Sequence, residues 1–338
     1  WTEPDGTGFA VKTATLQGGN WSRPVTITTS NSLFVNWADF PTVAAFNDGT
    51  LAVSWLQENT NIPYAYDINI ALSSDAGQTW GSPIVPHDDQ STRQHGFLTL
   101  LPTERDEMIA VWLDAREYNS QSPGDSFGNA VQLRSTTIGK DGTLGKDIPL
   151  DLRACSCCQT SAAITEDGTV LIAYRDRTAD EIRDISIVRR HNGVWSGPVN
   201  VHADGWEISG CPVNGPAIDA QATDAVVAWF TGADNIATIK VAFSEDSGVT
   251  FGPAFQVGSG ESVGRVGTLM LATGDALISW VEWTSDGEVL MLCRATKNDG
   301  CVARQTITEH AAAGSFNFPK LARSGDTIYL AWTQPIDS

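Results

Sequence analysis

Four of the six cysteines lie in two short segments, where sulfur can form disulfides or bind metal ions. Three stand in the run Cys155-Ser156-Cys157-Cys158, and the fourth is Cys211. Clustered thiolates bind soft or borderline metals, so copper or zinc is one candidate ligand. Disulfides are the alternative: a Cys157–Cys158 bridge with Cys155 joined to Cys211, or Cys211 paired with one of the adjacent cysteines. Free redox thiols are a third interpretation, and in each case we expect one cluster of four sulfurs.

The other two cysteines, Cys293 and Cys301, flank a predicted hairpin and are expected to form a structural disulfide. Six cysteines in an acidic chain poor in lysine favour an oxidising compartment. We therefore expect a secreted or periplasmic protein.

Two interleaved repeats must position these residues. The phrase Ser-x-Asp-x-Gly-x-Thr-aromatic occurs at residues 73–80 and 244–251, and four weaker copies lie elsewhere in the chain. Between the copies, six pairs of predicted strands are joined by a turn and end in an aromatic residue. These aromatics are Trp55, Trp112, Tyr174, Trp229, Trp280 and Trp332. A repeat of this length, with turn residues at fixed offsets, is typical of a β-propeller.

The repeats predict an all-β fold with six blades, each a sheet of four antiparallel strands. We expect residues 1–338 to form this single domain. Residues 316–333 lack a following outer hairpin, and residues 9–28 lack a preceding inner one. We therefore expect the N-terminal segment to complete the sixth blade and close the ring, which would remove free sheet edges. Two stacked sandwiches would leave the six copies unexplained.

The innermost strands of a propeller begin close to its central axis, where ligands usually bind. Aligning the repeats places a set of polar residues at these strand starts, beside the cysteines. The set comprises Asp39, His95, Asn214, Arg265 and Asn317. We expect it to bind the ligand, with His95 as a further candidate metal ligand. Asp67 lies in a bordering loop, and Trp37 and Trp206 are placed for stacking on a ligand, whereas His87 shows no partner in the sequence.

The turn phrase is known as the Asp-box, and together with the six blades it resembles the sialidase (neuraminidase) superfamily, in its bacterial repeat-containing branch. The resemblance covers nearly the whole chain as architecture. It implies three arginines that clamp the carboxylate of sialic acid, the first in an Arg-Ile-Pro phrase. Here the matching phrase is Asp39-Phe40-Pro41; Arg265 could be a second clamp residue, and Asn317 stands in the third place. An aspartate would repel a carboxylate, so we expect no genuine sialidase. The catalytic candidates are Asp39, Asp67 and Arg265.

The formal net charge of −19 argues against nucleic acids and anionic membranes as partners. No apolar run approaches the ~20 residues of a membrane span. We therefore expect an exported propeller that binds a small molecule, glycan or metal ion at a cysteine-lined mouth. A copper or zinc metalloprotein is one alternative, and a divergent exo-glycosidase is the other.

Overall fold

The computed structural model describes residues 1–118, 130–310, 314 and 316–333. Within these residues the fold consists of antiparallel strands and one short 3-10 helix, Ala233–Asn235. They contain no helix long and apolar enough to cross a membrane. The chain divides into two compact units, Trp1–Ser156 and Cys157–Ser338.

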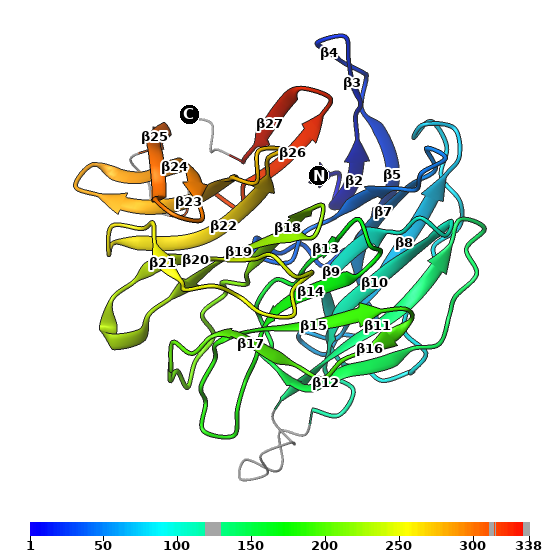
Figure 1. The fold of residues 1–338 in the computed structure, drawn as a ribbon. Helices are drawn as coiled ribbons and strands as arrows, with labels where there is room; N and C mark the ends of the chain where they lie inside the picture. Colours follow the sequence, from blue (N-terminus) through cyan, green and yellow to red (C-terminus); the bar gives the residue numbers. More distant parts are fainter. Residues whose placement is uncertain (119–129, 311–313, 315, 334–338) are drawn as a thin grey trace. The chain divides into compact units, whose positions relative to one another are not determined.

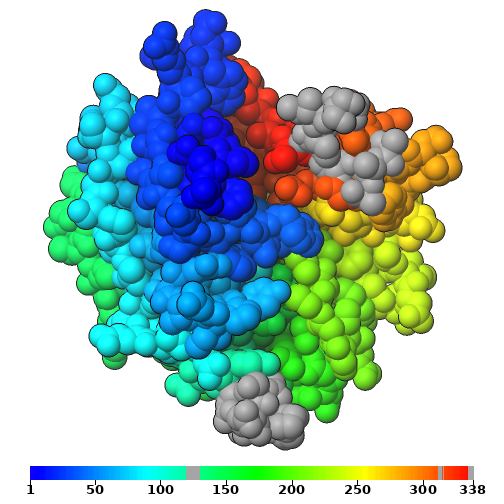
Figure 2. Space-filling view, turned by 180° about the vertical axis from the view of Figure 1, so that it is seen from behind, coloured from blue at the N-terminus to red at the C-terminus, as the bar shows by residue number. Residues whose placement is uncertain are grey.

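The first unit contains three main sheets (Figure 1). A three-stranded sheet has the order β1 (Thr2–Asp5), β2 (Gly8–Thr13) and β5 (Val25–Ser30), and a second has the order β6 (Val43–Ala45), β7 (Leu51–Glu58) and β8 (Tyr66–Ser73). A four-stranded sheet has the order β12 (Ile148–Ala154), β11 (Val131–Gly139), β10 (Glu107–Asp114) and β9 (His95–Pro102). The hairpin of β3 (Leu16–Gln17) and β4 (Asn20–Trp21) projects from the first sheet, as the blue projection in Figure 2 shows.

The second unit continues the pattern with further antiparallel sheets. One contains β13 (Ser161–Ile164), β14 (Val170–Arg175), β15 (Ile185–His191), β16 (Val194–Trp195) and β17 (Val199–His202). The next contains β18 (Ala217–Gln221), β19 (Asp224–Thr231), β20 (Thr238–Ser244) and β21 (Phe255–Gln256). A third contains β22 (Ser262–Met270), β23 (Ala276–Thr284), β24 (Gly287–Thr296) and β25 (Gly300–His310), and β26 (Lys320–Ser324) pairs with β27 (Thr327–Ala331).

The second strand of the central sheets is apolar because both of its faces are covered, whereas β27 is exposed at four of its five residues. Every residue of β14 is buried, as is every residue of β10 after Glu107. A strand covered on both faces needs no alternation of polar and apolar residues. Trp112 in β10 and Trp229 in β19 are at most 1% exposed and pack in the core, whereas Trp332, which follows β27, is 39% exposed.

The two strong turn phrases fold identically. Asp75 Oδ1 accepts hydrogen bonds from Ser73 Oγ at 2.8 Å and the Thr79 amide at 2.9 Å, while Thr79 Oγ1 donates to Asp75 Oδ2 at 2.6 Å. Asp246 repeats all three contacts with Ser244 and Thr250 at the same distances. Each aspartate thus ties both ends of its turn together.

The predicted all-β class with four-stranded antiparallel sheets is therefore confirmed. The β1–β2–β5 and β26–β27 sheets are the segments that ring closure would join, and closure stays a prediction, as do the six-blade count and the single domain.

Candidate functional site

Two histidines of the first unit stack face to face. His95 is the first residue of β9, and His87 lies in the connection that leads to it, shortly after Ile84 bridges to Ile70 in β8. Their ring centroids are 3.7 Å apart and the rings are 5° from parallel. Both side chains are buried, so the pair is held as a packed unit.

Two carboxylates bracket this pair, one along each edge. Asp67 Oδ1 lies 3.3 Å from His95 Nδ1 and 3.5 Å from His87 Nε2. Asp89 Oδ1 lies 3.0 Å from His95 Nε2 and 3.2 Å from His87 Nδ1. Each carboxylate oxygen therefore faces one nitrogen of both rings.

The carboxylates change the protonation of the site. Burial lowers the pKa of His95, but hydrogen bonds to Asp67 and Asp89 outweigh it and raise the pKa to about 9. Burial likewise opposes ionisation of the two aspartates, yet hydrogen bonds from the histidines lower the pKa of each. At neutral pH His95 is a cation between two anions.

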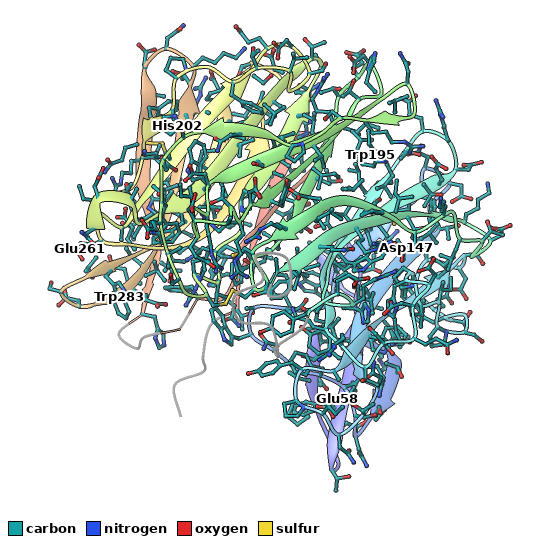
Figure 3. All side chains as sticks on the ribbon, turned by 90° about the horizontal axis from the view of Figure 1, so that it is seen from below. Glu58, Asp147, Trp195, His202, Glu261 and Trp283 are labelled. Carbon is teal, nitrogen blue, oxygen red and sulfur yellow. A yellow bond between two sulfur atoms is a disulfide. The ribbon has the colours of Figure 1, made fainter. Side chains whose placement is uncertain are left out.

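A second ionic layer lies beside the histidines. Arg116 donates to Asp114 Oδ2 at 2.8 Å and to Asp147 Oδ2 at 2.6 Å, and Arg134 donates to Asp147 Oδ1 at 2.7 Å. Asp147, which is labelled in Figure 3, directly precedes β12. Both arginines are thus bound by buried carboxylates.

The described residues offer two groups in this unit that could hold a metal ion. Asp67, His87 and His95 form one, and Asp89, His95 and Asp114 form the other, each with ligand atoms within 4.8 Å of one another. In the second group, the Arg116 guanidinium lies 3.2 Å from Asp89 and already supplies the positive charge that a metal ion would bring. In the first, a metal would have to meet both imidazole lone pairs, which lie in parallel planes. The geometry therefore fits a stacked histidine pair between two carboxylates better than a metal centre.

Asp39 lies next to this site and is buried. Both of its carboxylate oxygens accept from the Phe97 amide at 2.9 Å, and the Tyr66 hydroxyl donates to Oδ2 at 3.3 Å. Burial raises the pKa of Asp39 to about 7, although these hydrogen bonds act in the opposite direction. Tyr66 joins the two sites, because its carbonyl lies 3.3 Å from His95 Nδ1.

Exposed aromatic side chains, here called the aromatic rim, lie close to these residues in the chain: Trp37 precedes Asp39 by two residues and Tyr64 precedes Asp67 by three. Tyr64 is 68% exposed and Trp37 is 50% exposed. Phe34 contacts Tyr64 edge to face at 6.2 Å and stacks on Tyr66 at 4.1 Å. The rim is therefore linked by packing to the residue that joins Asp39 and His95.

The strand-start residues of the second unit are engaged in its framework. Asn214 Oδ1 accepts from the Arg265 amide at 2.9 Å, and Asn214 Nδ2 donates to the Val263 carbonyl at 3.0 Å. The Arg265 guanidinium donates to the Phe316 carbonyl and lies 3.5 Å from Glu288. Asn317 follows Phe316 and is half-buried. The predicted roles of these residues in ligand binding stay predictions.

Trp206 is not available for ligand stacking, contrary to our expectation. It is 9% exposed, and the Arg175 guanidinium carbon lies 4.9 Å from its ring centroid. Arg175 donates to the carbonyls of Asn214, Arg183 and Phe230, and burial lowers its pKa to about 9. The pair is a packing element of the second unit.

The cysteines are oxidised, and none of the six is free. Cys157 pairs with Cys211, which is one of the alternatives left open by the sequence, and Cys155 and Cys158 are also disulfide-bonded. The Cys293–Cys301 disulfide across β24 and β25 is confirmed. Cys157 and Cys158 lie in the connection before β13, because strand pairing starts at Ser161 with Ala173.

A cavity of about 230 Å³ lies in the second unit, lined by the first strands of its sheets. Asp219 and Lys320 are its charged lining residues. Burial raises the pKa of Asp219.

Sequence reasoning missed His87 and Asp89. Their signal is weak, because they lie in an irregular connection and meet Asp67 only through the bridge of Ile84 to Ile70. The run His87-Asp88-Asp89, followed by His95, is the one local hint.

A scan against protein-family models and a search of curated proteins give no match. Solved structures do match. A Hadza microbial sialidase aligns with a TM-score of 0.53 and 14% identity, covering 86% of this chain and 61% of its own. The NanB sialidase of Streptococcus pneumoniae, in its K499G mutant, aligns at 0.56 and 10% identity, covering 89% and 65%. An α-L-arabinanase of Penicillium chrysogenum complexed with arabinobiose aligns at 0.57 and 13% identity, covering 85% of both chains.

These likenesses show that the chain has the sialidase-like β-propeller fold. The chain spans less than two thirds of the length of the two sialidases. At identities of 10–14% the likeness speaks for the fold alone.

Proposed function

We propose that this chain is an exported, six-bladed sialidase-like propeller that binds a neutral glycan, and that it is not a genuine sialidase. One observation carries the proposal: the polar groups of the histidine site that reach solvent are the carboxylates Asp67 and Asp89, with side chains 26% and 16% exposed. Carboxylates accept hydrogen bonds from sugar hydroxyls but repel the carboxylate of a sialic acid.

The positive charges near this site are already paired with carboxylates, which favours a neutral ligand over an anionic one. Arg116 is held by Asp114 and Asp147, and Asp39 stands where the resemblance implies a clamp arginine. A bidentate charge-assisted pair contributes about 1.5–3 kcal/mol, so a sialoside would lose that stabilisation and meet repulsion as well.

The aromatic rim supplies the other half of sugar recognition. A flat exposed ring can cover the apolar face of a sugar while carboxylates bind its hydroxyls. Tyr64 and Trp37 are the exposed aromatics beside Asp39 and Asp67. The arabinobiose in the arabinanase structure is a neutral disaccharide, and the disulfides suit an oxidising compartment.

Calorimetric titration with a panel of neutral oligosaccharides tests the proposal. Tyr64→Ala should weaken binding at least tenfold. The matched control is Trp21→Ala, which removes an aromatic of similar exposure, 69%, from the projecting β3–β4 hairpin and should leave binding unchanged. Equal effects of the two variants would contradict the proposed site.

A divergent exo-glycosidase is the second candidate function. Asp39 has a raised pKa of about 7 and Asp67 a lowered one, and opposed shifts of neighbouring carboxyls are typical of an acid and base pair. Hydrolysis of chromogenic neutral glycosides, lost in both Asp39→Asn and Asp67→Asn, would support it. Binding without turnover would leave a binding protein.

A further inference from the structure

The cavity of about 230 Å³ in the second unit is bordered by the first strands of four successive sheets. Its lining comes from residues 159–161, 215–219, 266–269 and 318–321, which belong to β13, β18, β22 and β26 or directly precede them. These strands lie side by side in that order. The space between them holds several water molecules or one small organic molecule.

Polar side chains join the neighbouring first strands, because these strands belong to different sheets. The Ile218 amide of β18 donates to Ser161 Oγ of β13 at 3.1 Å. The Met270 amide of β22 donates to Asp219 Oδ2 of β18 at 2.7 Å. These bonds hold Asp219 in place in the cavity wall, so a ligand meets a carboxylate that is already oriented.

The charge of Asp219 is not compensated by a cation in contact with it. Burial raises its pKa and outweighs the hydrogen bonds from the amides of Met270 and Ala220, while Arg323 exerts only a weaker attraction. Within the part of the chain that the structure describes, the Asp219 carboxylate forms no ion pair. A cationic group of a ligand would therefore stabilise the ionised carboxylate.

Lys320 brings the opposite charge to the same cavity. It lies in β26 and is exposed. Since Asp219 forms no ion pair among the described residues, Lys320 does not neutralise it by direct contact. Apolar residues complete the lining, among them Ile218, Leu269 and Phe318. The cavity thus presents one anion, one cation and an apolar surface.

We propose that this cavity binds a small zwitterion, namely an α-amino acid with an aliphatic side chain. The ammonium group donates to the Asp219 carboxylate, the ligand carboxylate accepts from Lys320 Nζ, and the aliphatic group packs against the apolar lining. A molecule with only one of the two charges leaves the other lining charge without a partner in the ligand. The site lies in the second unit and does not depend on the proposed glycan site of the first.

Calorimetric titration of the full-length chain with L-valine tests the proposal. Isobutylamine and isovalerate are the matched fragments, because each retains the branched chain and one of the two charges of valine. We expect saturable binding of one valine per chain, and each fragment should bind at least tenfold more weakly. This comparison uses the parent protein and requires no substitution.

Two variants test the assigned charges. Asp219→Asn, which keeps an acceptor for the Met270 amide, and Lys320→Gln should each weaken valine binding at least tenfold. The matched controls are Asp224→Asn and Lys297→Gln, which remove an ion pair of 2.7 Å outside the cavity lining and should bind as the parent does. Near-UV circular dichroism of the tryptophans verifies that each variant is folded.

Absence of valine binding to the parent would overturn the proposal. Equal affinity for valine and isobutylamine would also overturn it, because Lys320 would then play no part. Full affinity in Asp219→Asn or in Lys320→Gln, or an equal loss in the control variants, would contradict the assigned contacts.

Discussion

Asp39 and Asn214 perform the same task with different chemistry. Each accepts a backbone amide at a strand start in the next sheet: the Phe97 amide at 2.9 Å and the Arg265 amide at 2.9 Å. Phe97 and Arg265 have φ of 55° and 57°, a region that non-glycine residues rarely adopt. The side-chain acceptor stabilises that turn of the backbone, and only Asp39 adds a buried charge.

Asp39→Asn should therefore stabilise the protein in a pH-dependent way. The pKa of Asp39 is raised from 3.8 to about 7, so the folded state binds the proton more tightly than the unfolded state does. The free energy of unfolding of the parent must then fall as pH rises from 4 to 7, by at most about 1.4 kcal/mol per pH unit. The carboxamide does not titrate, so the advantage of the variant should grow over this range and level off above it.

Urea unfolding of both proteins at several pH values measures this difference. Asn214→Asp is the reciprocal control and should lose stability as pH rises. A constant difference between Asp39→Asn and the parent from pH 4 to 8 would contradict the assigned pKa.

His95 should titrate far above an ordinary histidine. Its pKa is raised from 6.5 to about 9 in the folded state, so its contribution is fully present below pH 6.5 and is lost as pH rises through 9. We expect the imidazole resonances of His95 to move near pH 9 in NMR spectra, with stability falling between pH 7 and 9. Titration near 6.5 would mean that Asp67 and Asp89 do not hold the ring.

At the scale of the element, the turns were predictable because the hydrogen bonds that shape each turn are local. The serine, aspartate, glycine and threonine of residues 73–80 bond to one another, so their order determines the turn. The histidine pair was not predictable, because it depends on a connection of irregular backbone between β8 and β9. The starting points of the inner strands were predicted only approximately: Cys157 and Cys158 were expected at a strand start, but pairing of β13 begins at Ser161.

The glycines of the two turns should differ in their tolerance of alanine. Gly77 and Gly248 have φ of 85° and 72°, and alanine in this region costs about 1 kcal/mol at either position. An added Cβ at Gly77 meets nothing closer than 3.5 Å, whereas at Gly248 it would lie 2.6 Å from Leu171, which is fully buried. Gly248→Ala should therefore lower the melting temperature clearly more than Gly77→Ala. Equal losses in calorimetry would show that Leu171 moves aside freely.

At the scale of the whole molecule, the repeats predicted the fold class and the antiparallel sheets, since aromatics such as Trp112 and Trp229 recur with the period of the sheets. The ligand was beyond prediction, because it depends on which charges stay exposed. Asp39 is buried and hydrogen-bonded to Phe97 and Tyr66, whereas the Asp67 side chain is partly exposed to solvent. The repeat pattern does not predict this difference in exposure.

Ring closure makes a prediction about distant segments. If residues 9–28 complete the sixth blade, deletion of residues 1–30 should expose the amides of 316–333 and destabilise the remaining sheets. Hydrogen exchange of the truncated and full-length chains measures this directly. Unchanged protection of β26 and β27 would mean that the N-terminal segment does not close the ring.

The central claim is that the site of Asp67, His87, Asp89 and His95 receives a neutral sugar. The most direct measurement is calorimetric titration of the full-length chain with arabino-oligosaccharides and with sialyllactose, in the same buffer near pH 7. We predict saturable binding of a neutral oligosaccharide that is lost in Asp67→Ala, with no heat from the sialoside. Tight binding or turnover of sialyllactose, with no response to neutral sugars, would contradict the account.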